Sequence, residues 1–567
     1  MRCVRSIRFC LAVAALLGWS VAPARAQTWQ SAFSFGVGGV YDLQFDAAGN
    51  LYMAGYFART ATFGTIQLTS RPLAVDAFVA KRSPAGVWLW ATSAAGRGPD
   101  YARGLTVDPA TGAVYVTGAF SSDTLTLGAI KLANFTGAAG ASFIAEDDFV
   151  ARIDPTTGQW LWAVSGGTFA NEAGPPGRPV LDGAGDIYTS FQVADRPATF
   201  GPFTLPARGG SDLVVACLSP AGVWRWANRL GGADNESGGG LVGAPGGGVY
   251  VCGAFASPTM AVGATTLTNA GTGAASTDAF VASLTAAGAW SWAVRAGGSA
   301  LDGFNALATD SVGALYAAGY FSTTAGVGAT TLTAVGGSDA LVAKLSPAGQ
   351  WGWAVRGGGL GNEPLRHVLV ARGRILVTGQ FVGQSSTWGV TTLTGYGAED
   401  VVVAALSPQA VWCWAAGAGS DGPSAGHDYG YALARNPLDG LLYAGGTFFG
   451  ATFTAGPHTL PLTIVGGYDS FMAVLRGGTC APLQAAADPA DARAGLALAP
   501  NPAHDAVHLT GLPADTRSVE VLDALGRVVR TVALAPAGAP TVLDVRGLPA
   551  GLYGVRAGRA TRRLVVE

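Results

Sequence analysis

The hydrophobic positions of this chain fall into short runs, and the same order of runs returns seven times. In the unit from Gly298 to Gly358, the runs cover Asn305–Asp310, Ala314–Phe321, Asp339–Leu345 and Gln350–Val355, with glycine-rich turns between them. Short runs rich in Val, Tyr and Phe and joined by tight turns are typical of β-strands. Each unit is therefore expected to form a four-stranded antiparallel meander, with the Gly328–Thr333 segment as a connection.

These strands are apolar on both sides, as in Ala340–Ala343, so each sheet needs a neighbour on both faces. Stacking around an axis supplies that cover and predicts a β-propeller, whereas the alternative, a linear β-solenoid, is built from shorter coils. The seventh unit lacks the Trp-x-Trp strand that the other six contain, and Thr28–Ala32 provides a similar run at the other end. We therefore predict an all-β chain with a seven-bladed propeller over 27–478, closed by its N-terminal strand.

The first 26 residues have the features of a secretory signal peptide. Three arginines precede the apolar run Leu11–Ala22, and a small-x-small motif predicts cleavage between Ala26 and Gln27. The alternative, a membrane anchor, is disfavoured because the apolar run is too short to span a bilayer. No later apolar stretch is long enough either, so we expect an exported mature chain without a membrane span.

The charge of the chain limits the expected partners, and its cysteines limit the expected disulfides. Residues 1–26 hold four arginines and no acidic residue, so their removal would change the formal net charge from −2 to −6. An acidic chain without a basic stripe argues against binding to nucleic acid or to an anionic membrane surface. Export permits disulfides among Cys217, Cys252, Cys413 and Cys480. Because the first three lie in apolar strands, buried thiols are the favoured interpretation.

The repeat resembles a known family. The phrases G-N-L-Y-x-x-G-x-F, D-A-F-V-A-K-L-S and G-x-W-x-W-A are similar to the SBBP β-propeller repeats of exported bacterial proteins, over residues 27 to about 478. The third unit departs from the pattern because Ile187–Phe191 lacks the strand glycine, and the sixth because Leu376 replaces the tyrosine. This resemblance implies a propeller but no single activity.

After Cys480 the composition changes to an Ala/Asp/Pro linker, predicted over 479–493. Residues 494–567 contain about seven short apolar runs, which predict a small Ig-like β-sandwich. The Pro500–Pro502 opening, the Asp523–Arg527 turn and the Leu548–Tyr553 signature resemble the type A C-terminal sorting domain of the type IX secretion system. The resemblance implies delivery to the outer surface of a Gram-negative bacterium or secretion from it, with the secretion machinery as a partner. An ordinary adhesive module is the alternative.

Two recurrent features could form binding sites or serve the scaffold. The paired tryptophans lie on one strand face, and their recurrence favours packing between blades over stacking on sugars. An aspartate opens the third strand of every unit, which favours a structural role in accepting turn N–H groups. These seven residues are Asp76, Asp148, Asp212, Asp278, Asp339, Asp400 and Asp469.

A second acidic position follows the Gly-Gly after the fourth strand in six units, at Asp100, Glu172, Glu236, Asp302, Glu363 and Asp428. Since the first and third strands of a meander start on the same side, both acidic sets are expected on one rim, unless the connection before the third strand is itself a single extra strand. Structural turn-capping is the favoured interpretation. The alternative is a site for Ca²⁺ or a cationic ligand, and no other cofactor is expected.

Signals for catalysis are weak. No motif of a serine hydrolase, zinc protease or nucleotide-binding enzyme stands in a suitable context. The polar group around His427 and Asp428 resembles a catalytic cluster, although a solvated loop explains it. We therefore expect a monomeric, non-enzymatic surface or secreted protein that binds an extracellular protein or glycan. The alternatives are a polysaccharide lyase or glycosidase on a propeller scaffold and a purely structural role in a surface layer.

Overall fold

The computed structural model describes residues 27–135, 146–168, 177–271, 276–421, 427–463, 467–478 and 480, and, near the C-terminus, 497–499, 501, 503–510, 516–523, 528–534, 541–549, 551–557 and 560–566. The predicted signal peptide, including Ala26, and the predicted linker apart from Cys480 lie outside these residues. Contacts divide the chain into two units, Met1–Cys480 and Ala481–Glu567, which are described separately. No helix among the described residues is long and apolar enough to cross a membrane.

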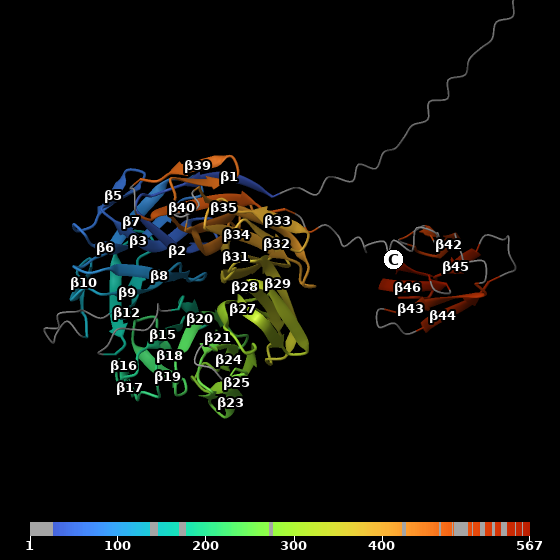
Figure 1. Cartoon of the computed structure of the whole chain (residues 1–567), viewed down its shortest axis with the longest axis horizontal. Coiled ribbons are helices and arrows are strands. Elements are labelled where there is room, and N and C mark those ends of the chain that lie inside the picture. Colours follow the sequence, from blue (N-terminus) through green and yellow to red (C-terminus); the bar gives the residue numbers. More distant parts are fainter. Residues whose placement is uncertain are drawn as a thin grey trace, which may run out of the picture. The chain divides into compact units, whose positions relative to one another are not determined.

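The first unit consists of seven four-stranded antiparallel sheets arranged around a common centre (Figure 1). The first four blades, listed from the innermost strand outward, are β2 (Gly38–Phe45), β3 (Leu51–Ala58), β6 (Val75–Arg82) and β7 (Trp88–Ala94); β8 (Asp100–Val107), β9 (Val114–Phe120), β12 (Asp147–Ile153) and β13 (Trp160–Gly166); β14 (Val180–Leu181), β15 (Ile187–Val193), β18 (Asp212–Leu218) and β19 (Trp224–Leu230); and β20 (Glu236–Gly243), β21 (Val249–Phe255), β24 (Asp278–Leu284) and β25 (Trp290–Ala296).

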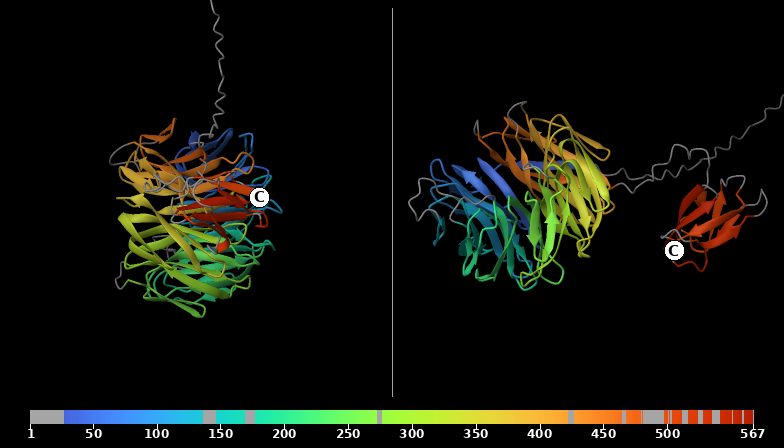
Figure 2. Two further views of the ribbon diagram at one scale, coloured as in Figure 1. Left: turned by 90° about the vertical axis from the view of Figure 1, so that its right-hand side faces the viewer. Right: turned by 60° about the horizontal axis from the view of Figure 1, so that its bottom comes forward.

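The remaining blades are β26 (Asp302–Thr309), β27 (Leu315–Val327), β28 (Thr330–Leu345) and β29 (Trp351–Gly359); β30 (Leu365–Ala371), β31 (Arg374–Val382), β34 (Glu399–Leu406) and β35 (Trp412–Ser420); and β36 (Tyr429–Arg435), β37 (Leu442–Phe448), β40 (Asp469–Arg476) and β1 (Thr28–Phe33). The predicted seven-bladed propeller is thus confirmed. Figure 2 shows the blades from two other directions, with the sheets stacked face against face around the ring.

The ring closes by pairing the two ends of the propeller. In Figure 1, β1 lies beside β40, with Trp29 opposite Leu475 and Phe33 opposite Met472. The Trp29 side chain is buried, and its indole N–H donates to the carbonyl of Gly417 in the sixth blade at 3.1 Å. The strand missing from the seventh unit is therefore supplied by the N-terminal residues, as the sequence predicts.

The segment expected to connect the second and third strands forms a β-hairpin instead. The hairpins are β4 (Thr60–Phe63) with β5 (Ile66–Thr69), β10 (Thr124–Leu127) with β11 (Ile130–Ala133), β16 (Ala198–Phe200) with β17 (Phe203–Leu205), β22 (Thr259–Val262) with β23 (Thr265–Thr268), β32 (Ser385–Trp388) with β33 (Thr391–Thr394), and β38 (Thr452–Ala455) with β39 (His458–Pro461), whereas in the fifth blade β27 and β28 themselves continue into the hairpin. Two added strands preserve chain direction, so the first and third strands still start on the same rim.

Each hairpin also covers the blade before it. The Ala95 N–H at the end of β7 donates to Thr126 of the next blade's hairpin at 3.0 Å, and Thr126 donates back at 2.9 Å. Equivalent bridges join Gly231 to Ala261 and Gly297 to Gly326. These bridges pair the ends of the outer strands β7, β19 and β25 and so shorten the open edge available for pairing with another chain.

The tryptophan pairs hold neighbouring blades together. The second tryptophan of a pair donates its indole N–H to a turn carbonyl of the next blade, for example from Trp292 to Pro347 at 3.1 Å. The first tryptophan donates to the preceding blade, for example from Trp351 to Arg295 at 3.2 Å. The packing role favoured from the sequence is therefore confirmed, with a hydrogen bond in each direction around the ring. The expectation that both tryptophans lie on one strand face is wrong, because a bulge at the residue between them, Gly352 in the fifth blade, turns them to opposite faces.

The cysteine prediction is half wrong. Cys217 and Cys252 are buried free thiols as expected, but Cys413 forms a disulfide with Cys480. In β35, Cys413 is the extra residue of a bulge between Trp412 and Trp414. Its partner Cys480 follows the last strand of the propeller, and Trp414 beside Cys413 donates to the carbonyl of Gly478 at 3.1 Å. The bond therefore ties the end of the seventh blade to the sixth blade.

Reduction of this disulfide should destabilise the propeller. The bond closes a loop of 67 residues, for which chain entropy predicts a loss of up to about 4 kcal/mol in the free energy of unfolding. Urea unfolding followed by tryptophan fluorescence measures this loss selectively, because no tryptophan follows Trp414 in the sequence. The Cys413→Ser/Cys480→Ser variant serves as the control and should not respond to reductant. Equal stability of oxidised and reduced wild type would contradict the prediction.

The second unit has two sheets. One contains β41 (Ala497–Ala499), β42 (Ala506–Thr510) and β45 (Thr541–Asp544), and the other contains β43 (Ser518–Leu522), β44 (Val528–Ala533), β46 (Gly551–Ala557) and β47 (Ala560–Val566). Alternate residues of both sheets, such as Val507, Val519 and Val555, are fully buried between them. The predicted small β-sandwich is confirmed.

Candidate functional site

The structure brings the two acidic sets together in pairs between neighbouring blades. Asp76 interacts electrostatically with Asp100, Asp212 with Glu236, Asp278 with Asp302, Asp339 with Glu363, and Asp400 with Asp428. All ten side chains are buried. Glu172 lies outside the described residues. Asp469, which opens β40, is buried as well.

One member of the first set is assigned differently by the structure. In the second blade the aspartate opposite the last phenylalanine of the second strand is Asp147, opposite Phe120, as Asp76 is opposite Phe57. Asp147 also accepts a loop N–H, that of Phe135, at 2.6 Å. The predicted equivalent, Asp148, is wrong by one residue, because two consecutive aspartates leave the sequence alignment ambiguous.

Backbone donors hold most of these carboxyl groups. Asp278 accepts from the N–H of Ala270 at 2.8 Å, and Asp302 accepts from the N–H groups of Gly298 at 2.6 Å and Ser322 at 3.1 Å. These donors come from the hairpin end, from the Gly-Gly after the fourth strand and from the end of the second strand. The carboxyl groups therefore satisfy backbone groups wherever the chain turns at this rim.

Burial keeps several of these carboxyl groups protonated near neutral pH. Burial raises the pKa of Asp100 to about 8, those of Glu236, Glu363 and Asp428 to about 7, and those of Asp76, Asp302 and Asp400 to about 6. The neighbouring carboxyl group raises the pKa of Glu363 further, since Asp339 lies within hydrogen-bonding reach. A carboxyl pair of this kind is most stable when it holds one proton.

Three interfaces contain an arginine that the other two lack. Arg229, Arg295 and Arg356 pair with Asp212, Asp278 and Asp339, the latter two at 2.8 Å. No described arginine or lysine pairs in this way at the Asp76–Asp100 and Asp400–Asp428 interfaces. Among the residues that the structure describes, no group of three or more His, Cys, Asp or Glu side chains is placed to hold a metal ion. Calcium binding therefore stays a prediction, which a comparison of melting temperature in Ca²⁺ and in chelator would test.

The enzyme-like group predicted around His427 is split by the fold. His427 Nδ1 lies 3.0 Å from the Glu399 carboxylate, whereas Asp428 is buried and accepts from the Ser420 hydroxyl at 2.7 Å. Asp421 accepts from the N–H of Thr452 at 3.0 Å. The two aspartates thus hold backbone and hydroxyl donors of the fold, and only the His427–Glu399 pair is partly exposed.

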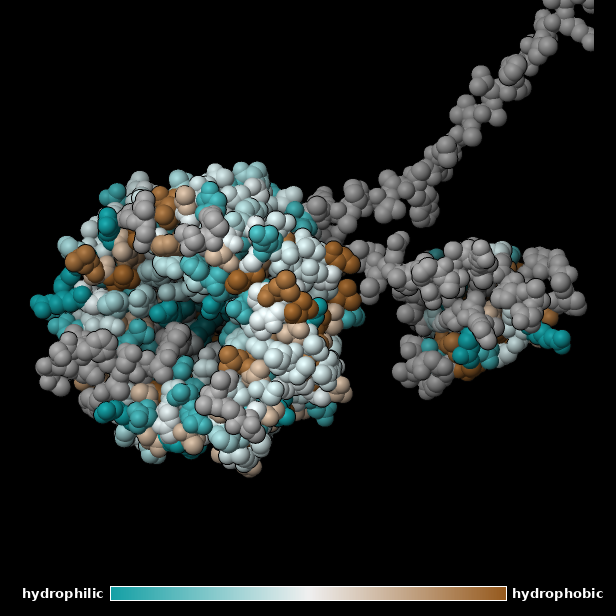
Figure 3. Space-filling model, viewed as in Figure 1, coloured by the Kyte–Doolittle hydropathy of each residue, from teal (hydrophilic) through white to brown (hydrophobic). Residues whose placement is uncertain are grey.

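The position where the blades differ most is a β-bulge in the innermost strand. The register shifts at Tyr41, Arg103, Gly239, Asn305, Arg366 and Tyr431. A bulge changes the direction of its extra side chain. All six residues line one cavity of about 1070 Å³ at the centre of the ring, which we call the central channel. In Figure 3 this centre is a hollow in the propeller face with hydrophilic residues inside it.

The sequence analysis did not predict these channel residues, although their spacing from the second acidic residue could have identified them. In the second and in the fourth to seventh units the bulge residue lies three positions after the second acidic residue, as Arg103 does after Asp100. The acidic position recurs, but the bulge position varies between Arg, Gly, Asn and Tyr in those units. Variation at one position of an otherwise repeated frame is the pattern expected of a functional surface.

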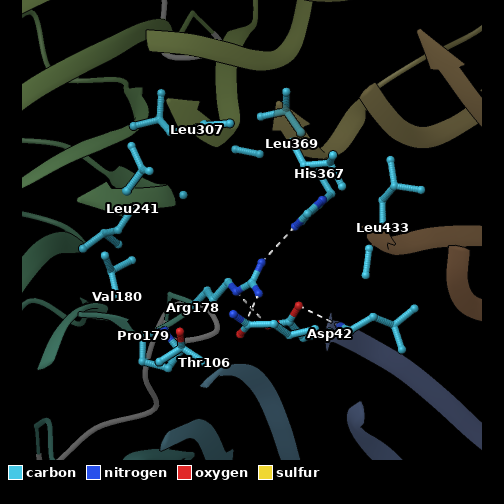
Figure 4. Close-up of a pocket in the computed structure, with 18 of the residues that line it drawn as sticks. Asp42, Thr106, Arg178, Pro179, Val180, Leu241, Leu307, His367, Leu369 and Leu433 are labelled. Carbon is cyan, nitrogen blue, oxygen red and sulfur yellow. Dashed lines mark hydrogen bonds and ion pairs between the residues drawn. The ribbon is translucent and has the colours of Figure 1, made fainter. Parts of the chain in front are cut away.

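In the third blade, Arg178 enters the channel just before β14. Figure 4 shows its side chain extended across the channel towards His367, whose Nε2 lies 3.3 Å from Nη1. Its Nε lies 3.2 Å from the Asp42 carboxylate, and its Nη2 donates to Gln44 at 3.2 Å. Arg178 therefore links the first, third and sixth blades through the middle of the ring.

Burial is the main influence on the protonation of the two titratable groups that Arg178 touches, and the charge of Arg178 is the second. Burial, followed by the charge of Arg178, lowers the pKa of His367 to about 3, so the imidazole is neutral. Since an arginine only donates, His367 Nε2 accepts and the proton resides on Nδ1. Burial raises the pKa of Asp42, and the charge of Arg178 and the N–H groups of Leu105 and Leu43 oppose that rise.

Comparison with known proteins identifies the family of the second unit. Residues 497–567 match the family described as "Secretion system C-terminal sorting domain". No curated protein sequence matches the chain. Similar solved structures include a protein of unknown function from Dyadobacter fermentans (11% identity, 80% of this chain and 98% of that chain, TM-score 0.37) and the Dos1 propeller (7%, 79% and 95%, 0.35). Another is BamB from Moraxella catarrhalis (12%, 79% and 99%, 0.33), and no argument about activity rests on these low scores.

The sorting domain accounts for the destination of the propeller. Its presence at the C-terminus implies an interaction with the type IX secretion machinery. The seven closed blades in front of it form the part that is delivered. The chain is thus a seven-bladed β-propeller protein with a type IX secretion sorting domain, and it is exported to the outer surface of a Gram-negative cell or secreted.

Proposed function

We propose that the exported propeller is a non-enzymatic binding protein whose ligand enters the central channel. The observation that carries this proposal is the bulge position, where a repeated scaffold presents unlike side chains to one cavity. The buried acidic positions and the tryptophan pairs, by contrast, recur in most units with the same residue types. Selection for packing alone gives no reason for Arg103, Asn305 and Tyr431 to differ at equivalent positions.

The state of the titratable groups inside the channel favours binding over catalysis. Asp42 is buried and engaged by Arg178 and two backbone N–H groups. His367 has a pKa of about 3, far below the pH range in which a general base works well. These groups support Arg178 and are poorly suited to proton transfer. The partly exposed His427–Glu399 pair is the observation that favours the alternative, an enzyme acting on extracellular polysaccharide.

Binding assays on the full exported chain test the proposal. Extracellular polysaccharides and proteins are screened for a rise in the melting temperature of the tryptophan signal, and polysaccharide hits are assayed for new reducing ends. We expect a binder without product release. The Val242→Trp substitution, which narrows the channel, should abolish the shift, whereas Val312→Trp on the outer surface should not, because Val312 is 82% exposed.

Two results would contradict the proposal. Release of new reducing ends that is lost in His427→Ala would indicate an enzyme. A ligand that binds Val242→Trp as well as wild type would place binding outside the channel, provided that both tryptophan variants melt near the wild-type temperature.

A further inference from the structure

We infer that the channel recognises the carboxylate group of an acidic saccharide, and that Arg103 and Arg366 hold that group. This inference rests on the proposed function and specifies the ligand of the same channel. It follows from the charge of the cavity and from the way the arginines are held.

The cavity carries an excess of positively charged side chains, whereas the whole chain has a formal net charge of −2. Four arginines and two aspartates line it, whereas the whole chain has 34 Lys and Arg against 36 Asp and Glu. One of the aspartates, Asp42, is already paired with Arg178. A concave site lined by one sign of charge concentrates its field and favours a ligand of the opposite sign.

Arg103 and Arg366 are held by aromatic rings at the bulge level. The Arg103 guanidinium lies 4.4 Å from the ring centre of Tyr41 and 4.3 Å from that of Tyr101. Arg366 lies 5.4 Å from the ring centre of Tyr431, and the rings of Tyr41 and Tyr431 are 5.0 Å apart. The four side chains therefore form a continuous Arg–Tyr–Tyr–Arg arc across four adjacent blades, the sixth, seventh, first and second.

Stacking of this kind leaves hydrogen-bonding capacity at the guanidinium edge. Each guanidinium lies over a tyrosine ring, and its N–H groups match the two oxygens of a carboxylate. Arg103 also makes a side-chain hydrogen bond with Tyr41. Arg366 uses its Nε to bond Gln380 at 2.8 Å. The charge of Arg103 also acts on Glu146, where it opposes the rise in pKa caused by burial. Arg366 is therefore the better position for a test.

Arg178 lines the same cavity as this arc. Its guanidinium is held by Asp42, Gln44 and His367 at 3.2–3.3 Å, so these contacts orient it without a ligand.

The surrounding groups suit a saccharide. Tyr41 and Tyr431 line the cavity, and burial raises their pKa values, so their hydroxyl groups stay protonated and can donate to and accept from sugar hydroxyls. An acidic peptide is the alternative that the test below distinguishes.

Isothermal titration of the full exported chain with trigalacturonate and with its methyl ester tests the inference. The two ligands differ only in charge and in the ester methyl groups. We expect the acid to bind at least about tenfold more tightly, since a charge-assisted hydrogen-bonded pair contributes about 1.5–3 kcal/mol. Arg366→Gln should reduce the affinity for the acid to that for the ester. The matched control is Arg225→Gln, because Arg225 pairs with Asp186 and does not line the channel.

The outcomes separate this inference from the proposed function. Equal affinity for acid and ester in the wild type would overturn the carboxylate preference and leave channel binding standing. An acidic peptide of equal charge that binds as tightly as trigalacturonate would overturn the saccharide assignment. Absence of binding by trigalacturonate would overturn the inference, whereas the proposed function would fall only if the broader panel also failed. The wild-type comparison does not depend on any variant folding.

Discussion

Trp29→Ala should lower the free energy of unfolding of the propeller by about 3–5 kcal/mol, the usual range for removal of a buried tryptophan. Trp29 is the buried anchor of β1 and donates to Gly417 across the sixth and seventh blades. Since β1 reaches the seventh blade from the far end of the chain, its loss should also expose β40. We expect faster hydrogen exchange in β40 and β37, measured by mass spectrometry.

Two substitutions serve as controls for this prediction. Trp351→Ala removes the equivalent tryptophan from the fifth blade, where the strand continues directly from its own blade, so it should cost similar stability without exposing β40. Gln30→Ala changes an exposed neighbour whose side chain bonds only to Thr28 among the described contacts and should have little effect. If Trp29→Ala and Trp351→Ala gave the same exchange pattern in β40, closure by β1 would not be a special point of weakness.

Raising the pH from 5 to 8.5 should destabilise the propeller. Asp100 has a pKa of about 8 in the fold against an ordinary value of 3.8, so the folded state keeps a proton that the unfolded state releases. The stabilisation is complete below about pH 4 and is lost as the pH rises to about 8, and at this one group it amounts to up to about 5 kcal/mol. Urea unfolding at a series of pH values, followed by tryptophan fluorescence, measures the slope.

Asp100→Asn should flatten this slope. The amide stays neutral at every pH and can still accept from Ser122, so stability should be near that of the wild type at pH 5 and higher by a few kcal/mol at pH 8.5. Asp302→Asn is the matched control. Asp302 has a pKa of about 6 and its neighbour Asp278 is paired with Arg295, so the gain at pH 8.5 should be smaller. Wild-type stability that rises between pH 5 and 8.5 would contradict the assignment.

The repeat made most of the fold predictable. Seven anchor aspartates and six tryptophan pairs defined the blades, and the unmatched run at Trp29 predicted how the ring closes. The extra hairpins were less visible, because four-residue strands such as Thr60–Phe63 are too short for a periodic signal. The Cys413–Cys480 bond depends on which face of a strand meets a distant residue, and local sequence does not contain that information.

The candidate site could be predicted only in part. Recurrent acidic residues are easy to find, and the structure pairs them inside the scaffold. The channel residues lie at a bulge, where one extra residue reverses the side-chain alternation on which sequence patterns depend. Arg178 is harder still, because its blade has only a two-residue inner strand and the partners Asp42 and His367 come from blades far away in the sequence.

The pairing of β1 with β40 also determines the order in which the molecule can assemble. Each of the first six blades uses one continuous stretch of chain, so its strands can pair as soon as that stretch is present. The seventh blade needs residues 28–33 and 472–476 together. Contacts between such distant residues form slowly, because a long loop must be closed before they stabilise anything. The strands within the first six blades can therefore pair in order along the chain. The ring is completed only after residue 476 is present, because β1 has no strand to pair with until β40 has formed.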